Sequence, residues 1–201
     1  MVRTVQGRDA SFSDAGGAGA GEETVDIIHA LVREGFRVMA HIGYTPQGGE
    51  RSRVGGSADA AADLFALARR VRAAGAESLV LEKVDELVHR ALADHSDAIP
   101  TFAIFSGKSS RGGQSVNVWD AVFRPGFKAR YFPPTAEFDT KEFPAAYTED
   151  QIARKMEVLL KLVALGEFPL SPPSALRLED AAWLAGLNPW AEGCGHLPGR
   201  G

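Results

Sequence analysis

A single cysteine, Cys194, occurs among the 201 residues, so the chain cannot form a disulfide bond within itself. We therefore expect a protein of a reducing compartment, the cytoplasm. No apolar run approaches the roughly 18 residues of a membrane-spanning helix, and the first residues lack the apolar segment of a secretory signal. Basic charge is not in excess either, since the formal net charge is −4. We accordingly expect no nucleic-acid or membrane partner.

Apolar residues occur in two alternating patterns along the chain. Short and nearly continuous apolar runs predict strands that are covered on both faces: "FRVMAHIG", "ESLVLEKV", "IPTFAIFSG" and "QSVNVWD". Segments with helical spacing lie between them. One such face contains Val25, Ile28, Leu31 and Val32, and a second contains Leu64, Leu67, Ala68 and Val71. Strands that alternate with helices at this spacing predict an α/β fold with a parallel sheet.

Two more helices are predicted towards the C-terminus. "TEDQ", at Thr148 to Gln151, is a capping box that opens a long helix. The apolar stripe that this helix should bury comprises Ile152, Met156, Leu159, Leu160 and Val163. A short helix is expected over 178–185, beyond a proline-rich stretch. Residues 1–21 are small, polar and rich in glycine, and their lack of a sustained period predicts disorder.

Polar groups follow three of the predicted strands at their C-terminal ends. They are His41, Glu82 and the loop "SGKSSRGGQ". In parallel α/β folds this end of the sheet carries the site. A poorly solvated carboxylate at Glu82 is a candidate general base, although a salt bridge to Lys83 or to a nearby arginine would explain it equally well. His41, taken alone, is either a structural residue or part of a pocket.

Known ligand-binding motifs are missing from the sequence. It has no H-E-x-x-H, paired-cysteine or EF-hand spacing, so no metal site is assigned from a motif. "GAGAGE" lacks the spacing of a dinucleotide fingerprint, and "SGKSSRGG" lacks that of a P-loop. Within that loop, Lys108 and Arg111 either bind an anion or belong to a solvated turn.

Six segments, read in order, resemble one enzyme family. They are "GFRVMAHIGYTPQ", "RAAGAESLVLEKV", "IPTFAIFSG", "GQSVNVWDAV", "PGFKARY" and "GEFP". The series is similar to P-V-x-G-H-x-G-L-T-P-Q, A-G-A-x-x-x-V-L-E-x-V-P, I-P-x-I-G-I-G-A-G, D-G-Q-x-L-V-x-H-D and G-x-F-P of ketopantoate hydroxymethyltransferase, also called 3-methyl-2-oxobutanoate hydroxymethyltransferase. The resemblance covers about residues 22–169.

The resemblance implies a (β/α)8 TIM-barrel fold of the phosphoenolpyruvate mutase/isocitrate lyase superfamily. It also implies transfer of a hydroxymethyl group from 5,10-methylenetetrahydrofolate to 3-methyl-2-oxobutanoate, a step of pantothenate biosynthesis. A Mg²⁺ ion would hold the 2-oxoacid and stabilise its enolate. By the same resemblance Glu82 is the general base, and His41 lines the pocket and binds substrate.

Other family features are not matched. The family's metal-binding G-D-S does not occur, and the lysine and glutamate of its K-x-E-G-G-E motif fall on Gly17 and Gly19. Asp120 is kept from the V-x-H-D pattern. The matched strands would be numbers five to eight, so we expect the C-terminal half of a barrel. The chain would be a truncated product, half of a split enzyme, or a divergent paralogue without activity or with another 2-oxoacid as substrate.

This interpretation divides the chain into three parts: a disordered stretch over 1–21, a partial barrel domain over 22–170, and a C-terminal extension with a short helix over 171–201. A half-barrel leaves open sheet edges and an uncovered inner face. We therefore expect a homo-oligomer, or a partner chain that completes the barrel.

Overall fold

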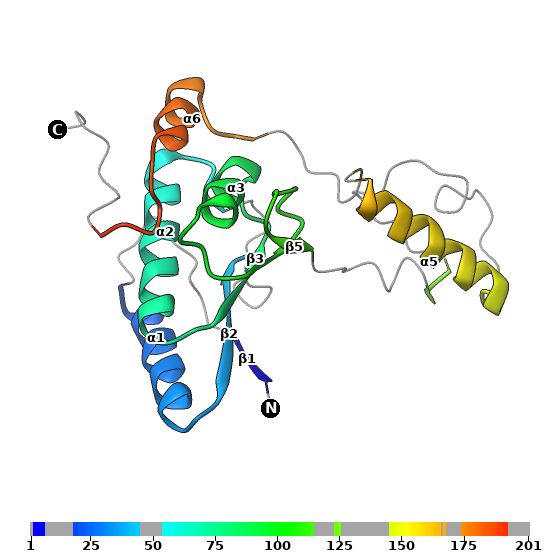
Figure 1. Ribbon diagram of the computed structural model, residues 1–201, viewed down its shortest axis with the longest axis horizontal. Helices are drawn as coiled ribbons and strands as arrows, with labels where there is room; N and C mark the ends of the chain where they lie inside the picture. The colour runs from blue at the N-terminus through cyan, green and yellow to red at the C-terminus, as the bar shows by residue number, and fades with distance from the viewer. Residues whose placement is uncertain are drawn as a thin grey trace.

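Five parallel strands form one sheet in the order β1-β2-β3-β4-β5. The structure, a computed structural model, describes residues 2–6, 18–44, 54–114, 123–125, 145–165, 167 and 174–192. The strands are β1 Val2–Gln6, β2 Arg37–Gly43, β3 Ser78–Glu82, β4 Thr101–Ile104 and β5 Gly113–Gln114. Three helices connect the first four strands: α1 Ala18–Arg33, α2 Ala58–Ala73 and α3 Glu86–Asp94 (Figure 1). The predicted α/β fold with a parallel sheet is confirmed.

The N-terminal part of the chain contributes more structure than its composition suggests. Strand β1 pairs in parallel with β2, with Val2 opposite Arg37 and Gln6 opposite His41. Both β1 and the start of α1 at Ala18 fall within 1–21, where the sequence predicts disorder. The run "VRTVQ" is too short for a period to be recognised beside the glycines that follow it. The strand predicted from "QSVNVWD" begins at β5, and its residues 115–120 lie outside the described part of the chain.

The main hydrophobic core lies on one face of the sheet. Val38, Ala40 and Ile42 of β2 are at most 2% exposed, and Leu79 and Leu81 of β3 are fully buried. They pack against apolar residues of α1, α2 and α3. Because each fully buried aliphatic side chain contributes roughly 1.5–3 kcal/mol, this face fixes the sheet to its helices. The alternate residues of the same strands face the other way, and several of them are only partly buried.

The predicted short helix is present as α6 Leu178–Ala185, and its segment is bound to α3. Asp85, the N-cap of α3, is fully buried and accepts hydrogen bonds from the amides of Leu87 (3.1 Å) and Ala175 (2.8 Å) and from the hydroxyl of Ser174 (2.7 Å). Farther along, the Trp190 indole donates to the carbonyl of Leu92 at 3.0 Å. Charge-assisted bonds at one end and an aromatic anchor at the other therefore hold residues 174–192 on the body of the fold.

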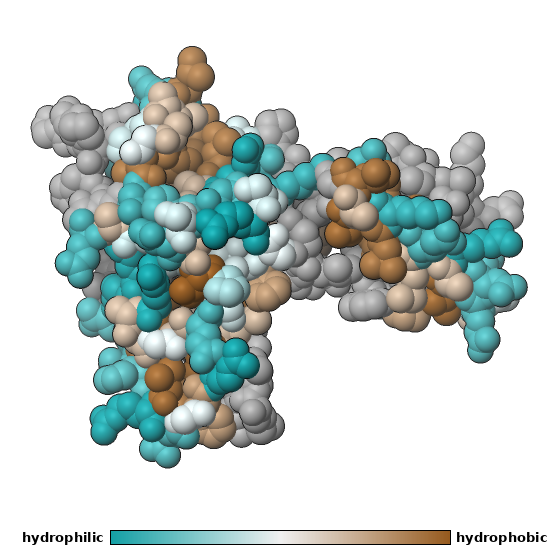
Figure 2. Space-filling model, in the orientation of Figure 1, coloured by the Kyte–Doolittle hydropathy of each residue, from teal (hydrophilic) through white to brown (hydrophobic). Residues whose placement is uncertain are grey.

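Helix α5, Glu149–Ala164, carries the capping box that the sequence predicts. Its buried residues include Leu159 and Leu162, at 3% and 8% exposure. The prediction that Leu160 is buried is wrong, because this side chain is 63% exposed. One residue along a helix turns the side chain by about 100°, so Leu160 lies away from the stripe that contains Leu159. Apolar residues are visible on the surface of α5 (Figure 2), and Leu165, the C-cap that follows the helix, is also exposed.

Among the helices that the structure describes, none has the length and apolar character needed to cross a membrane.

Candidate active site

Two neighbouring strands bring the predicted histidine and glutamate together. In the parallel register His41 of β2 lies opposite Val80 of β3, and Gly43 lies opposite Glu82. Since paired residues share a face and the side chains alternate, His41 and Glu82 point to the same side of the sheet. The imidazole Nε2 of His41 is 3.2 Å from the carboxylate Oε2 of Glu82. Both groups lie at the C-terminal edge of the sheet, as the sequence predicts.

The His41–Glu82 pair is almost enclosed by protein. The side chains of His41 and Glu82 are 8% and 11% exposed. Their separation lies within ion-pair distance, but the orientation does not satisfy hydrogen-bond geometry, and Nε2 is buried without a hydrogen-bond partner among the described residues. A small rotation of either group would form the bond, and catalytic hydrogen bonds are often misaligned before substrate binds. The pair therefore offers a carboxylate acceptor that the adjacent imidazole can orient.

Gly43 allows β2 to approach the end of β3 closely. Its φ is +98°, and a Cβ added there would lie 2.4 Å from the carbonyl oxygen of Glu82 and 2.9 Å from Cγ2 of Val84. The next residue, Tyr44, donates its amide to the same Glu82 carbonyl at 2.8 Å. Only glycine meets both the backbone conformation and the space, so Gly43 fixes the distance between the two strands at the site.

Replacement of Gly43 by alanine is expected to destabilise the fold by about 2 kcal/mol, because it adds backbone strain to a contact with the Glu82 carbonyl. Urea unfolding measures this change in the free energy of unfolding. Gly35→Ala is a matched control, since Gly35 also has a positive φ (+80°) but nothing lies within 4 Å of the point where its Cβ would be added. Equal losses in the two variants would show that the close approach at Gly43 is unimportant.

Ser106 holds the ends of β3 and β4 together. Its fully buried hydroxyl donates to the carbonyl of Leu81 at 2.7 Å and accepts the amide of Val84 at 2.9 Å. Its carbonyl lies 3.0 Å from Nδ1 of His89, which is fully buried in α3. Ser106 is the first residue of the predicted polar loop "SGKSSRGGQ". Its structural role could not be predicted from the sequence, because its partners are distant in sequence.

The loop that follows β4 contacts the end of α3. The amides of Ser110 and Arg111 both donate to the Asp94 carboxylate, at 2.7 and 3.1 Å, and the Arg111 guanidinium donates to the carbonyl of His95 at 3.1 Å. These bonds give Arg111 a structural role, while Lys108 of the same loop is partly buried. The salt bridge considered for Glu82 with Lys83 or an arginine is not observed among the described residues, where Nε2 of His41 lies within ion-pair distance of the carboxylate.

The described residues do not fit the Mg²⁺ ion that the family resemblance implies. None of their clusters brings together three or more histidine, cysteine, aspartate or glutamate side chains that could hold a metal. Mg²⁺ favours octahedral oxygen ligands, whereas His41 and Glu82 supply one nitrogen and one carboxylate. Gly19 of α1 has no side chain to offer, and Gly17, Asp120 and Cys194 lie outside the described part of the chain.

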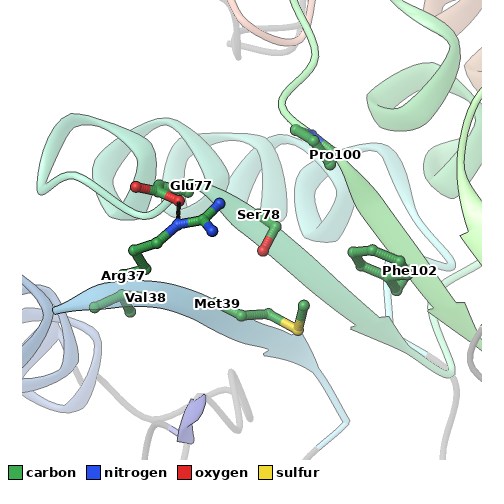
Figure 3. Close-up of a pocket in the computed structure, with 7 residues that line it drawn as sticks. All are labelled: Arg37, Val38, Met39, Glu77, Ser78, Pro100 and Phe102. Atoms are coloured by element: carbon green, nitrogen blue, oxygen red, sulfur yellow. Dashed lines mark hydrogen bonds and ion pairs between the residues drawn. The ribbon is translucent and has the colours of Figure 1, made fainter. Parts of the chain in front are cut away.

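A cavity of about 290 Å³ lies at the opposite end of the strands (Figure 3). Its lining residues are Arg37, Val38, Met39, Glu77, Ser78, Pro100 and Phe102. Arg37 and Glu77 form an exposed ion pair there, with Nε and Oε2 at 2.6 Å. This is the N-terminal edge of the sheet, where residues of parallel folds usually contribute to stability and not to chemistry. The His41–Glu82 pair is therefore the candidate site, and this cavity is not.

The structure is thus a parallel α/β sheet with a carboxylate and an imidazole beside each other at its C-terminal edge, an arrangement common in α/β enzymes. A sequence profile described as "Ketopantoate hydroxymethyltransferase" matches residues 16–149. The chain belongs to this family.

Relatives from several organisms carry the name 3-methyl-2-oxobutanoate hydroxymethyltransferase. The protein of Ruegeria sp. (strain TM1040) is 40% identical over 147 residues, which cover 67% of this chain and 50% of that protein. The Rhodospirillum centenum protein is 38% identical over 149 residues, covering 67% and 51%. The protein of Halobacterium salinarum (strain ATCC 29341 / DSM 671 / R1) is 36% identical over 138 residues, covering 66% and 48%. The chain thus spans about half the length of the curated relatives it matches.

Proposed function

We propose that this chain catalyses, within a ketopantoate hydroxymethyltransferase, the transfer of a hydroxymethyl group from 5,10-methylenetetrahydrofolate to 3-methyl-2-oxobutanoate. This reaction would serve pantothenate biosynthesis. The observation that carries the proposal is the buried contact of 3.2 Å between His41 Nε2 and Glu82 Oε2. Family membership supports the choice of substrate class. The contact supports Glu82 as the base and His41 as the group that orients it.

In the proposed mechanism, Glu82 removes the proton from C3 of the 2-oxoacid. The C–H bond breaks, its electrons pass into the enolate of the neighbouring carbonyl, and the proton is held on the carboxyl group. C3 then forms a bond to the methylene carbon of the folate, and the bonds from this carbon to N5 and N10 break. Water supplies the hydroxyl group, and tetrahydrofolate leaves with one proton from that water and the proton that Glu82 had removed. His41 binds substrate at the pocket wall and keeps the Glu82 carboxylate directed at C3.

We further propose that β1 to β5 form part of a (β/α)8 barrel that a second copy or another chain completes. The support is the face of the sheet opposite the main core, where Met39, Phe102 and Ile104 stand only partly buried among the described residues. In a closed barrel this face packs against side chains of the remaining strands. A homo-oligomer or a complex would provide them.

The proposal is tested most directly by proton exchange, because that step needs the base but not the folate. The purified full chain is incubated with 3-methyl-2-oxobutanoate in D₂O, and loss of the C3 proton signal is followed by NMR. We expect exchange faster than in buffer, and formation of ketopantoate when the folate donor is added. A folded chain, with a cooperative thermal transition, that promotes neither reaction contradicts the catalytic proposal and leaves a non-catalytic subunit as the interpretation.

A further inference from the structure

Lys83, directly after the proposed base, has an unusual backbone conformation. Its φ is +49°, in the left-handed region that non-glycine residues seldom occupy. The turn carries the lysine side chain to the end of the neighbouring strand, where Nζ lies 3.7 Å from the centroid of the Tyr44 ring. Tyr44 is itself bonded through its amide to the Glu82 carbonyl at 2.8 Å. A cation is thus held at the same edge of the sheet as the His41–Glu82 pair.

Hydrogen bonds on both sides of Lys83 maintain this conformation. Its amide donates to the carbonyl of Ile104 at 2.8 Å, and its carbonyl accepts the amide of Val54 at 2.9 Å. The following amide, that of Val84, is bound by the buried Ser106 hydroxyl. Left-handed backbone in a lysine is unfavourable, and it persists where the surroundings determine it on several sides. Such conformations are concentrated at functional sites, where they fix the direction of a side chain.

The charge of Lys83 has no carboxylate partner among the described residues, although the side chain is partly buried. Its ammonium instead contacts the face of the Tyr44 ring. A ring face stabilises a cation electrostatically but accepts few of its hydrogen bonds, so the three N–H groups of the ammonium remain able to bind an anion. Glu82, the nearest acid in sequence, has the imidazole of His41 beside its carboxylate.

We propose that Lys83, positioned by Tyr44, binds the carboxylate of the 2-oxoacid whose C3 proton Glu82 removes. This inference rests on the proposed function and adds a substrate-binding residue to it. The two roles are complementary, because a ligand whose acid group is held by the ammonium is oriented relative to the adjacent base. The ammonium also selects 2-oxoacids over uncharged ketones, and Tyr44 acts as a positioning residue.

The test measures KM and kcat for the C3 exchange reaction in the full chain. Lys83→Met keeps an unbranched, flexible side chain and removes the terminal ammonium, and we expect KM to rise roughly tenfold or more, as for loss of a hydrogen bond to a charged group. The value of kcat should change little, because the variant weakens substrate binding but leaves the base that removes the proton in place. Lys83→Arg should restore most of the affinity. Added salt should raise KM in the wild type more than in Lys83→Met.

Lys161→Met is the matched control, since Lys161 is an exposed lysine of α5 paired with Glu157. It should leave KM unchanged, which excludes a general effect of net charge. Unaltered KM in Lys83→Met, with active wild type, overturns the role of Lys83 but not the proposed function. A KM increase that accompanies a lowered melting temperature and is not restored by arginine also overturns it. Absence of exchange in the wild type instead refutes the proposed function.

Discussion

Replacement of Glu82 by glutamine is expected to slow C3 proton exchange by at least about 10²-fold, the usual contribution of a general base. Glutamine keeps nearly the same shape and still presents an oxygen to His41, but it cannot accept the proton. The effect should fall on kcat, because the missing interaction is made in the transition state and not in substrate binding. NMR detection of the C3 proton of 3-methyl-2-oxobutanoate in D₂O gives this rate directly.

Glu77→Gln provides the control for Glu82→Gln. Glu77 immediately precedes β3, and its carboxylate pairs with Arg37 in an exposed position at the other edge of the sheet. The two variants remove the same charge, so any difference between their exchange rates is due to the position of the lost carboxylate. Exchange that survives in Glu82→Gln, with unchanged melting behaviour, would assign the base to another residue. Equal losses in both variants would indicate an effect of charge or stability and not of proton transfer.

The position of the His41–Glu82 pair could be predicted from sequence because it depends on strand topology. Parallel strands end at one edge of a sheet, and the apolar runs before His41 and Glu82 mark two such ends. His41 and Glu82 lie close together because β2 and β3 are neighbours in the sheet. Helix ends were also predictable, since the capping box before α5 acts through residues three positions apart. These features depend on local patterns or on a simple rule of topology.

Other features required knowledge of contacts between distant segments. Ser106 contacts Leu81 and Val84, which lie more than twenty residues earlier, so its role has no local pattern. The conformation of Lys83 likewise depends on bonds to Ile104 and Val54 and cannot be inferred from the lysine itself. Side-chain periodicity placed the stripe of α5 but not its edge, because Leu160 lies outside the buried stripe and is exposed. Tertiary packing, and not propensity, decides such details.

A second large effect is expected from acid, through the buried histidine of α3. The ring of His89 is fully buried, with Nδ1 against the Ser106 carbonyl and Nε2 without a hydrogen-bond partner among the described residues. Burial, which disfavours the charged ring, lowers the pKa of His89 from its usual 6.5 to about 4. The Ser106 hydrogen bond and Asp94 oppose this change in pKa, whereas Arg90 adds to it.

Because the pKa is lower in the folded protein, between about pH 6.5 and 4 the unfolded chain binds the proton and the folded chain does not. The contribution of neutral His89 to stability is therefore complete above pH 6.5 and is lost as the pH falls towards 4. At about 1.4 kcal/mol per pH unit, the loss of stability approaches about 3 kcal/mol.

Urea unfolding between pH 7 and 4 measures this loss. The variant His89→Asn, whose amide can still donate to Ser106, should make the free energy of unfolding depend less on pH. His29→Asn removes an exposed histidine of α1 and is the control. Parallel curves for the wild type and His89→Asn would show that the buried imidazole does not control acid stability, since both proteins share every carboxylate.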